Sequence, residues 1–364
     1  MRWSLNIGKI FGIPVRLHVT FLAFVAWIAV GQGVATGDPS QALSALLLLF
    51  LVFLCVVLHE LGHALVARRY GIRTQDIVLL PIGGVARLER MPEKPSQELA
   101  VALAGPAVNV AILALLSVLL SRSDAPLPDW GLEGGLLPAL WVVNKAMVVF
   151  NLIPAFPMDG GRVLRSLLAM AMPYARATRV ASITGQALAL GFGLVGLFAN
   201  HAMLIFIALF VFLAAGEERA IVETRTSLSG VPVRDAMLSD FVTLEVGDPL
   251  QRAVDHLIAG SQQDFPVLEG EVPIGTLGRA ELIIALQKEG ADTPVGKVVR
   301  RDPAAAAPGE PLEGVLQRMR ARGRTALPVL EGGRVVGLVT IENISDLLLV
   351  SAALKKHDAA AAAS

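Results

Sequence analysis

Cysteine and charged residues are both scarce in this chain. Its 364 residues include one cysteine, Cys55, which excludes a disulfide scaffold and a cysteine-rich zinc site. Charged residues make up 17% of the sequence, well below the roughly 25% of an average soluble domain. The 31 basic and 31 acidic residues balance to a formal net charge of zero. The composition therefore gives no indication of nucleic-acid binding.

Hydrophobic residues are abundant and unevenly spread. They supply 54% of the chain, and apolar runs crowd the region before about Phe212, while charges and turn residues fill the rest. A run that crosses a bilayer needs about 20 apolar residues. The sequence therefore predicts an α-helical polytopic membrane protein with a C-terminal soluble part. The six transmembrane helices are expected at residues 17–34, 42–66, 98–120, 136–153, 180–199 and 202–215.

Lysine and arginine gather in every second connection between these spans, and therefore on one side of the membrane. They precede span one and fill the connections between spans two and three and between spans four and five, whereas the intervening connections hold only Arg122. Because basic residues stay on the cytoplasmic side, we expect a multi-pass plasma-membrane protein with both termini in the cytoplasm. The first apolar run is not followed by a small-residue cleavage site, so it is interpreted as a retained span.

The motif His59-Glu60-Leu-Gly-His63 lies at the end of the second apolar span. Residues four apart lie on one face of a helix, so His59 and His63 can share one Zn²⁺. Glu60 is close enough to reach a metal-bound water. Because the motif follows an uncharged run, the sequence indicates a protease that cuts inside the membrane.

A third zinc ligand is needed, because catalytic zinc usually takes three protein ligands and one water. Asp159 follows span four, at the same predicted membrane depth as the paired histidines. Two prolines before it interrupt the helix and two glycines after it allow a sharp turn, so its carboxylate can point back into the bundle. The alternative is that Asp159 merely N-caps the helix from Gly160 to Met170. The other histidines are interpreted as surface or interface residues: His18, His201, His256 and His357.

A hairpin is predicted between Asp76 and Glu89, where an apolar run is followed by Pro81 and by Gly83-Gly84. One interpretation is an ordinary surface hairpin. The other is a strand edge beside the site, to which an extended substrate adds by backbone hydrogen bonds.

In combination, these motifs resemble the site-2 protease family of intramembrane zinc metalloproteases over about residues 1–216. The resemblance is carried by HELGH, Pro81-Ile-Gly-Gly84, Ala104-Gly-Pro-Ala-Val-Asn109 and Phe150-Asn-Leu-Ile-Pro…Met158-Asp-Gly-Gly161. It implies that His59, His63 and Asp159 bind zinc and that Glu60 is the general base. It also implies a membrane-tethered protein substrate, from which cleavage releases a cytosolic fragment.

Four further residues are candidates for binding the substrate backbone or the oxyanion: Asn109, Gly83, Gly84 and Asn151. For Asn109 the alternative is a hydrogen bond across the helix bundle that serves packing alone. A substrate helix must unwind before its carbonyls become accessible. We therefore expect helix-destabilising residues near the cytoplasmic boundary of the substrate's transmembrane helix.

The soluble part is an internal repeat with an offset of 62 residues, in which Phe265-Pro-Val-Leu-Glu-Gly270 matches Leu327-Pro-Val-Leu-Glu-Gly332. It resembles a tandem pair of α/β cystathionine-β-synthase (CBS) domains. The expected boundaries are a linker at 217–230, copies at 231–290 and 291–352, and a disordered tail at 353–364.

The CBS resemblance implies a cleft for an adenine nucleotide, with Thr340 and Asn343 at the position of the usual Thr/Ser and Asp. Here the chain departs from the pattern, because asparagine replaces the aspartate and copy one has Gly278 and Glu281 instead. The alternative is a pair that only dimerises, giving a homodimer, or docks substrate.

Two other functions fit parts of the sequence. A CBS-regulated ion transporter would use the intramembrane histidines and aspartate as an ion path, but the spans are otherwise poor in ionisable residues. A catalytically inactive membrane scaffold would have no need to retain Glu60 between the two histidines.

Overall fold

The structure is a computed structural model that describes residues 3–36, 39–81, 83–92, 94–122, 128–131, 135–260, 262–302 and 304–361. The side chains of residues 32–39 and 355–361 lie outside that description. The chain divides into two compact units, Met1–Val222 and Glu223–Ser364.

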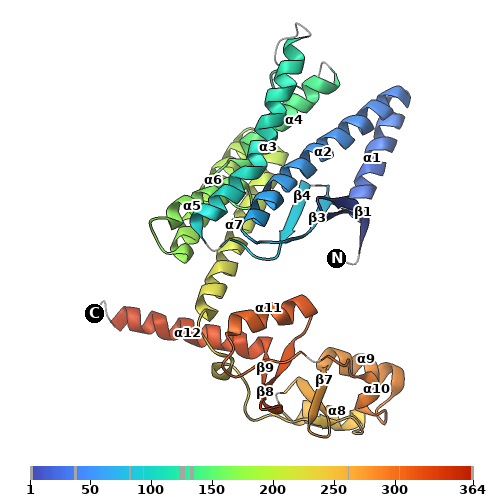
Figure 1. Ribbon diagram of the computed structural model, residues 1–364, viewed down its shortest axis with the longest axis vertical. Helices are drawn as coiled ribbons and strands as arrows, with labels where there is room; N and C mark the ends of the chain where they lie inside the picture. Colours follow the sequence, from blue (N-terminus) through green and yellow to red (C-terminus); the bar gives the residue numbers. More distant parts are fainter. Residues whose placement is uncertain are drawn as a thin grey trace. The chain divides into compact units, whose positions relative to one another are not determined.

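The first unit is mostly helical, as Figure 1 shows. Its helices are α1 (Val19–Thr36), α2 (Pro39–Arg69), α3 (Pro95–Ser121), α4 (Leu136–Asn151), α5 (Asp159–Ala169), α6 (Tyr174–Phe198) and α7 (Ala202–Leu228). Three helices of the described chain are long and apolar enough to cross a membrane: Ser40–Arg69, Pro95–Ser121 and Tyr174–Phe198. Two shorter apolar helices are Val19–Gly31 and Leu136–Asn151.

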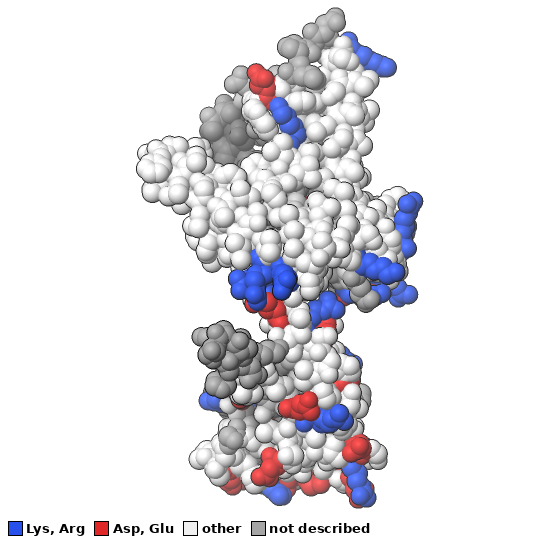
Figure 2. Space-filling view, turned by 90° about the vertical axis from the view of Figure 1, so that its left-hand side faces the viewer, with Lys and Arg blue, Asp and Glu red and all other residues white. Residues whose placement is uncertain are grey.

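Large apolar side chains are exposed along these helices, as expected where lipid takes the place of water. Examples more than half exposed are Trp27, Phe50, Leu115, Leu190, Phe206 and Leu213. The face of the first unit drawn in Figure 2 carries its charged groups near the two ends, with an uncharged band between them. These features and the apolar helices make the chain a membrane protein.

A four-stranded sheet packs beside α2. Its strands are β1 (Ser4–Ile10), β2 (Ile13–His18), β3 (Thr74–Leu80) and β4 (Gly83–Leu88), in the order β1-β2-β3-β4. The predicted hairpin is present, since β3 and β4 pair antiparallel with Leu79 opposite Gly84. Strands β1 and β2 were not expected from the sequence, and β2 runs to His18, inside the segment predicted as span one. Strand β4 is one edge of the sheet.

The second unit shows the internal repeat in three dimensions. Strands β6 (Asp264–Glu269) and β7 (Val272–Gly278) form a hairpin that recurs 62 residues later as β8 (Ala326–Glu331) and β9 (Arg334–Thr340). The register irregularity at Val267/Leu268 recurs at Val329/Leu330. Each copy has its own apolar core, one around Phe265 and one around Met319. The C-terminal part is therefore an α/β pair of equivalent repeats.

The remaining elements complete the two copies. They are η1 (Val233–Asp235), β5 (Leu244–Glu245), α8 (Leu250–Ala259), α9 (Arg279–Glu289), α10 (Val295–Val298), α11 (Leu312–Arg322) and α12 (Ile341–Ala361). Residues 217–228 of the predicted linker form the end of α7. Helix α12 includes residues 353–361 of the predicted tail, where alanine favours helix, and residues 362–364 lie outside the described chain.

Candidate functional site

His59, His63 and Asp159 lie together inside the first unit. Helix α2 carries both histidines one turn apart, and α5 begins at Asp159. Asp159 Oδ2 is 3.2 Å from Nε2 of His59 and 3.2 Å from Nε2 of His63, and the two Nε2 atoms are 3.1 Å apart. All three residues are buried. Side chains separated by 96 to 100 positions in the sequence therefore converge on one point.

The second nitrogen of each imidazole has its own partner. His59 Nδ1 donates to Asn109 Oδ1 at 2.5 Å, and His63 Nδ1 donates to the carbonyl oxygen of Val101 at 2.6 Å. These bonds assign the tautomer in which each Nε2 carries a lone pair, the arrangement typical of metal-binding histidines. Asp159 Oδ2 is buried and has no hydrogen-bond partner among the described residues.

Three electron-pair donors facing one another at this distance repel unless a cation lies between them. A tetrahedral zinc site with bonds of about 2.0–2.2 Å places its ligand atoms roughly 3.3–3.5 Å apart. The observed separations of 3.1–3.2 Å are close to that spacing. The site therefore fits a zinc ion in donor type, tautomer and size.

Gly105 supplies the space for the ion. A Cβ atom added at this position of α3 would lie 2.2 Å from His63 Nε2 and 2.6 Å from His59 Nε2. The helix therefore passes against the ligand atoms, and only glycine leaves the centre of the cluster open.

Asp159 does not cap α5. The residue before it, Met158, holds the N-cap position without a side-chain hydrogen bond, and Asp159 is the first residue of the helix with its carboxylate directed at the histidines. The capping alternative is therefore wrong. Gly160 and Gly161 allow the close packing of this helix start, since added Cβ atoms would lie 2.2 Å from Ile153 O and 2.7 Å from Ala155 C.

Glu60 lies beside the metal cluster, at a cavity of about 370 Å³. Its Oε2 accepts a hydrogen bond of 2.9 Å from the backbone N–H of Ala86 on β4. The same cavity is lined by four other predicted site residues: His59, Gly83, Gly84 and Asn151. A Cβ on Gly84 would lie 2.8 Å from Glu60 Cγ, so glycine lets the β4 edge approach the carboxylate. The structure thus brings the hairpin glycines and Asn151 to one cavity with His59 and Glu60.

Asn109 lies behind the cluster, fully buried, and does not line this cavity. Its Oδ1 accepts from His59 and its Nδ2 donates to Asn144 Oδ1 at 2.8 Å. The chain Asn144–Asn109–His59 therefore orients the imidazole of His59, a candidate zinc ligand. Sequence reasoning gave no role to Asn144, although a polar residue in an apolar span is a signal for one.

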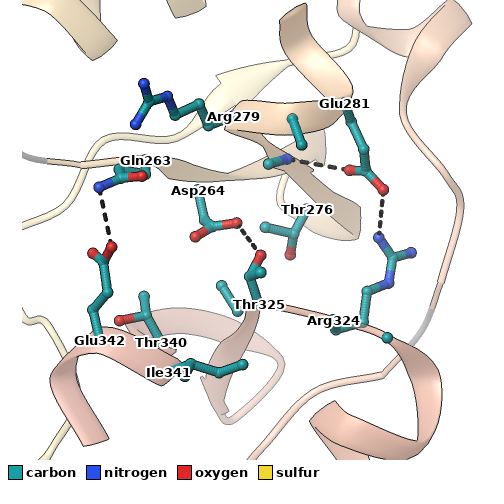
Figure 3. Close-up of a pocket in the computed structure, with 14 residues that line it drawn as sticks. Gln263, Asp264, Thr276, Arg279, Glu281, Arg324, Thr325, Thr340, Ile341 and Glu342 are labelled. Atoms are coloured by element: carbon teal, nitrogen blue, oxygen red, sulfur yellow. Dashed lines mark hydrogen bonds and ion pairs between the residues drawn. The ribbon is translucent and has the colours of Figure 1, made fainter. Parts of the chain in front are cut away.

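A second cavity, of about 480 Å³, lies between the two repeat copies and is drawn in Figure 3. Asp264, 9% exposed, points into it and accepts a 2.6 Å hydrogen bond from Thr325 of the other copy. Burial raises the pKa of the Asp264 carboxyl. Arg324 lies across from Glu281, with Nη1 and Oε1 3.4 Å apart.

Thr340 and Asn343, which were predicted to bind a nucleotide, form hydrogen bonds with each other. Thr340 Oγ1 donates to Asn343 Oδ1 and accepts from the Asn343 backbone N–H at 3.1 Å, which caps the start of α12. Thr340 lines the cavity, whereas Asn343 does not. Sequence reasoning missed Asp264 and Thr325, because neither occupies the motif position of the family pattern.

Comparison with known proteins identifies the family. The family model of peptidase family M50 matches residues 47–124 and 124–192, and that of the CBS domain matches residues 295–350. The chain is 32% identical to the zinc metalloprotease MJ0392 of Methanocaldococcus jannaschii over 344 residues, covering 94% of this chain and 96% of that protein. It is 31% identical to stage IV sporulation protein FB of Bacillus subtilis over 215 residues, covering 57% of this chain and 66% of that protein.

Among solved structures, the chain is similar to the site-2 protease from M. jannaschii, with 39% identity and a TM-score of 0.44, covering 60% of this chain and 95% of that one. Since the relative MJ0392 matches over nearly the full length of both chains, this chain belongs to the peptidase M50 (site-2 protease) family of zinc metalloproteases. The family resemblance seen in the sequence is confirmed, and with it the zinc cofactor.

Proposed function

We propose that this membrane zinc protease is an intramembrane endopeptidase that hydrolyses a peptide bond within or near the transmembrane helix of a membrane-tethered protein. His59, His63 and Asp159 would hold the zinc, and Glu60 would be the general base. One observation carries the proposal: three buried lone-pair atoms meet at 3.1–3.2 Å beside a cavity that Glu60 lines, on an apolar helix.

Zinc, when bound, polarises the substrate carbonyl and lowers the pKa of water. The protein supplies the proton transfers and the orientation. Glu60 accepts the proton of the attacking water at its carboxylate and passes it to the nitrogen of the leaving amine. Asn109 and the Val101 carbonyl keep the two imidazoles turned with Nε2 inward.

The substrate segment would bind as an added strand on β4. This strand is an edge of the sheet, and its Gly83 and Gly84 line the cavity together with Asn151. Glycine at both positions leaves room for a second backbone beside Glu60. The substrate helix must unwind to pair in this way, so helix-destabilising residues at its cytoplasmic boundary would favour cleavage.

The proposed arrangement in the plasma membrane has six transmembrane helices at the predicted spans, with both termini in the cytoplasm. The protease domain would comprise residues 1–216, followed by the linker, the two CBS copies and the tail. The alternation of basic connections supports this topology.

The CBS pair would regulate the protease by binding an adenine nucleotide, with dimerisation of the chain through this pair as a further proposal. A cavity of about 480 Å³ between equivalent elements of the two copies supports a ligand of this size. Thr340 lines the cavity, and Asp264 and Thr325 offer hydrogen-bonding groups to a ribose or base. Isothermal titration calorimetry of the full-length protein with AMP and with ATP tests this part. If neither binds, an adenine nucleotide is excluded as the ligand of the CBS pair.

The test of the main proposal uses full-length protein in proteoliposomes with a membrane peptide whose helix is interrupted near the cytoplasmic boundary. Zinc-dependent cleavage is expected for the wild type, and Glu60→Gln should reduce it by about 10²- to 10⁴-fold, as for loss of a general base. The matched control is Glu89→Gln, the same change at an exposed position of the following loop.

Three outcomes separate the candidate functions. Cleavage lost in Glu60→Gln and kept in Glu89→Gln supports the protease. Ion flux through the proteoliposomes that is equal in wild type and Glu60→Gln, without cleavage, would support transport. If the zinc-loaded wild type shows neither cleavage nor ion flux, the result would support an inactive scaffold.

A further inference from the structure

A buried ion pair in the first unit takes no part in the proposed chemistry. Arg165 on α5 is completely buried and Glu98 on α3 is 1% exposed. Arg165 Nε and Nη2 donate to Glu98 Oε1 at 2.8 and 2.5 Å, and Nη1 donates to Glu218 Oε1 on α7 at 2.5 Å. The guanidinium also lies 4.9 Å from the ring centroid of Phe156 and 5.1 Å from that of Tyr174. One side chain thus joins several segments of the bundle.

This ion pair is poorly suited to adding stability alone. Burying two charges costs several kcal/mol per ion, and apolar residues of similar size are often at least as stable. Both bonds from Arg165 go to a single oxygen of Glu98, and Glu98 Oε2 is buried without a hydrogen-bond partner among the described residues. Burial of this ion pair is therefore weak evidence that it serves stability.

The two charges belong to the elements that carry the zinc ligands. Helix α5 begins at Asp159, six residues before Arg165 and about 9 Å away along the helix axis. Glu98 lies in the first turn of α3, and three residues later the Val101 carbonyl accepts the hydrogen bond from His63 Nδ1. The first two turns of α3 therefore hold His63 directly through Val101, and hold the helix of Asp159 through Glu98 and Arg165.

Such a connection matters because the ligands come from separate helices. Zinc bonds of about 2.0–2.2 Å tolerate little displacement, and loss of an outer partner of a ligand typically costs 10- to 100-fold in metal affinity. The segment before Asp159 contains two prolines and no regular helix, so it cannot by itself hold the carboxylate in register with α2. An anchor on α5 beyond Asp159 supplies what that segment lacks.

We propose that Glu98 and Arg165 are a positioning pair, which sets α5 against α3 so that Asp159 meets His59 and His63 at zinc-binding distance. The inference rests on the proposed ligand set. Losing the pair would weaken zinc binding in protein that is still folded.

The experiment measures the zinc dissociation constant of purified full-length protein by competition with a chromophoric chelator. Arg165→Lys keeps the charge but loses the planar fork, Arg165→Met removes the charge, and Glu98→Gln removes the partner charge. Each should raise the zinc dissociation constant by about 10- to 100-fold. The matched control is Arg318→Met, because Arg318 is a partly buried arginine of the second unit that pairs with Glu310 and lines neither cavity, so its loss should leave zinc affinity unchanged.

Metal-free thermal unfolding, measured on the same samples, separates positioning from general stability. A purely structural pair would lower the unfolding temperature of the metal-free protein while the dissociation constant of the folded fraction stayed at the wild-type value. That result in Arg165→Lys and Glu98→Gln would overturn the proposal. If Arg165→Met does not fold, these two milder variants decide the question.

Asp159→Ala distinguishes failure of this inference from failure of the ligand set. Wild-type zinc affinity in Asp159→Ala would overturn the ligand assignment and the positioning pair with it. Weakened zinc binding in Asp159→Ala, with wild-type binding in the Arg165 and Glu98 variants, would overturn the positioning pair alone.

Discussion

The metal cluster of the first unit and the cleft of the second unit hold their polar groups in different ways. At the metal cluster each imidazole has one partner for Nδ1, and those partners are themselves buried. In the cleft the polar side chains come from two equivalent copies and bond mostly across the cavity, as Thr325 does with Asp264. The first arrangement fixes three donor atoms at the spacing of one small ion, and the second lines an open cavity of about 480 Å³.

The residues that line the cleft differ between equivalent positions of the two repeat copies. At an offset of 62 residues, Asp264 corresponds to Ala326 and Gly278 to Thr340. The scaffold strands kept the same register in both copies, while the side chains facing the cavity diverged. Backbone pairing depends on the repeated pattern, whereas the lining of the cavity depends on single residues.

The largest expected effect breaks the metal cluster itself. Gly105→Ala would place a methyl group 2.2 Å from His63 Nε2, on a helix that cannot withdraw because Val101 and Asn109 of the same helix bond the two rings. We expect zinc content to fall by more than about 100-fold, above the loss for one outer partner. Measurement is by metal analysis, with Gly191→Ala on α6, which meets nothing within 4 Å, as control. A zinc-loaded Gly105→Ala protein would contradict the assignment of this space to the ion.

A smaller effect is expected at Asn109, which contacts the cluster through His59. Asn109→Leu removes the acceptor for His59 Nδ1, so the ring loses its fixed orientation and zinc affinity should fall by about 10- to 100-fold. Ser117→Ala, on the same helix, is the control. If Asn109 binds the oxyanion instead, kcat would fall while the zinc dissociation constant stays at the wild-type value.

At the cavity beside the cluster, Gly84→Ala should slow the reaction without removing zinc. The added Cβ would lie 2.8 Å from Glu60 Cγ and from Val56 Cγ1, and would displace the carboxylate. A displacement of about 1 Å in catalytic geometry costs up to roughly 100-fold in rate. Steady-state kinetics and metal analysis check this, with Val85→Ala on the same strand as control. Equal kcat in Gly84→Ala and wild type would show that Glu60 tolerates the crowding.

The smallest effect concerns the cleft. Burial raises the pKa of Asp264, so the native protein holds this proton more tightly than the unfolded chain does. Stability therefore falls as pH rises from the ordinary pKa of 3.8 through the raised value, and Asp264→Asn should remove that fall. Amide hydrogen exchange of β6 and β7, compared between variant and wild type at each pH, is the measurement. The variant should be better protected at pH 7, with the difference vanishing below the window. A difference that is independent of pH would exclude the carboxyl as its source.

Much of the metal cluster could be predicted locally. The spacing of His59 and His63 places both on one helix face whatever surrounds them, and the prolines and glycines around Asp159 mark a broken helix. The N-terminal strands were missed, because β2 gains its place by parallel pairing with β3, where Val15 lies opposite Ile77. That pairing joins segments with no shared local pattern.

The sequence alone determined the division of the chain into an apolar part and a duplicated part. It also determined that two histidines share one helix face and that Asp159 follows an interruption of the helix. Each of these features depends on residues that are close together in the sequence. Tertiary packing alone decided that Arg165 meets Glu98, that Gly105 faces the ligand nitrogens and that Asp264 rather than Asn343 enters the cleft. These contacts join residues far apart along the chain. Their partners are selected by how helices and strands pack, which no local pattern encodes.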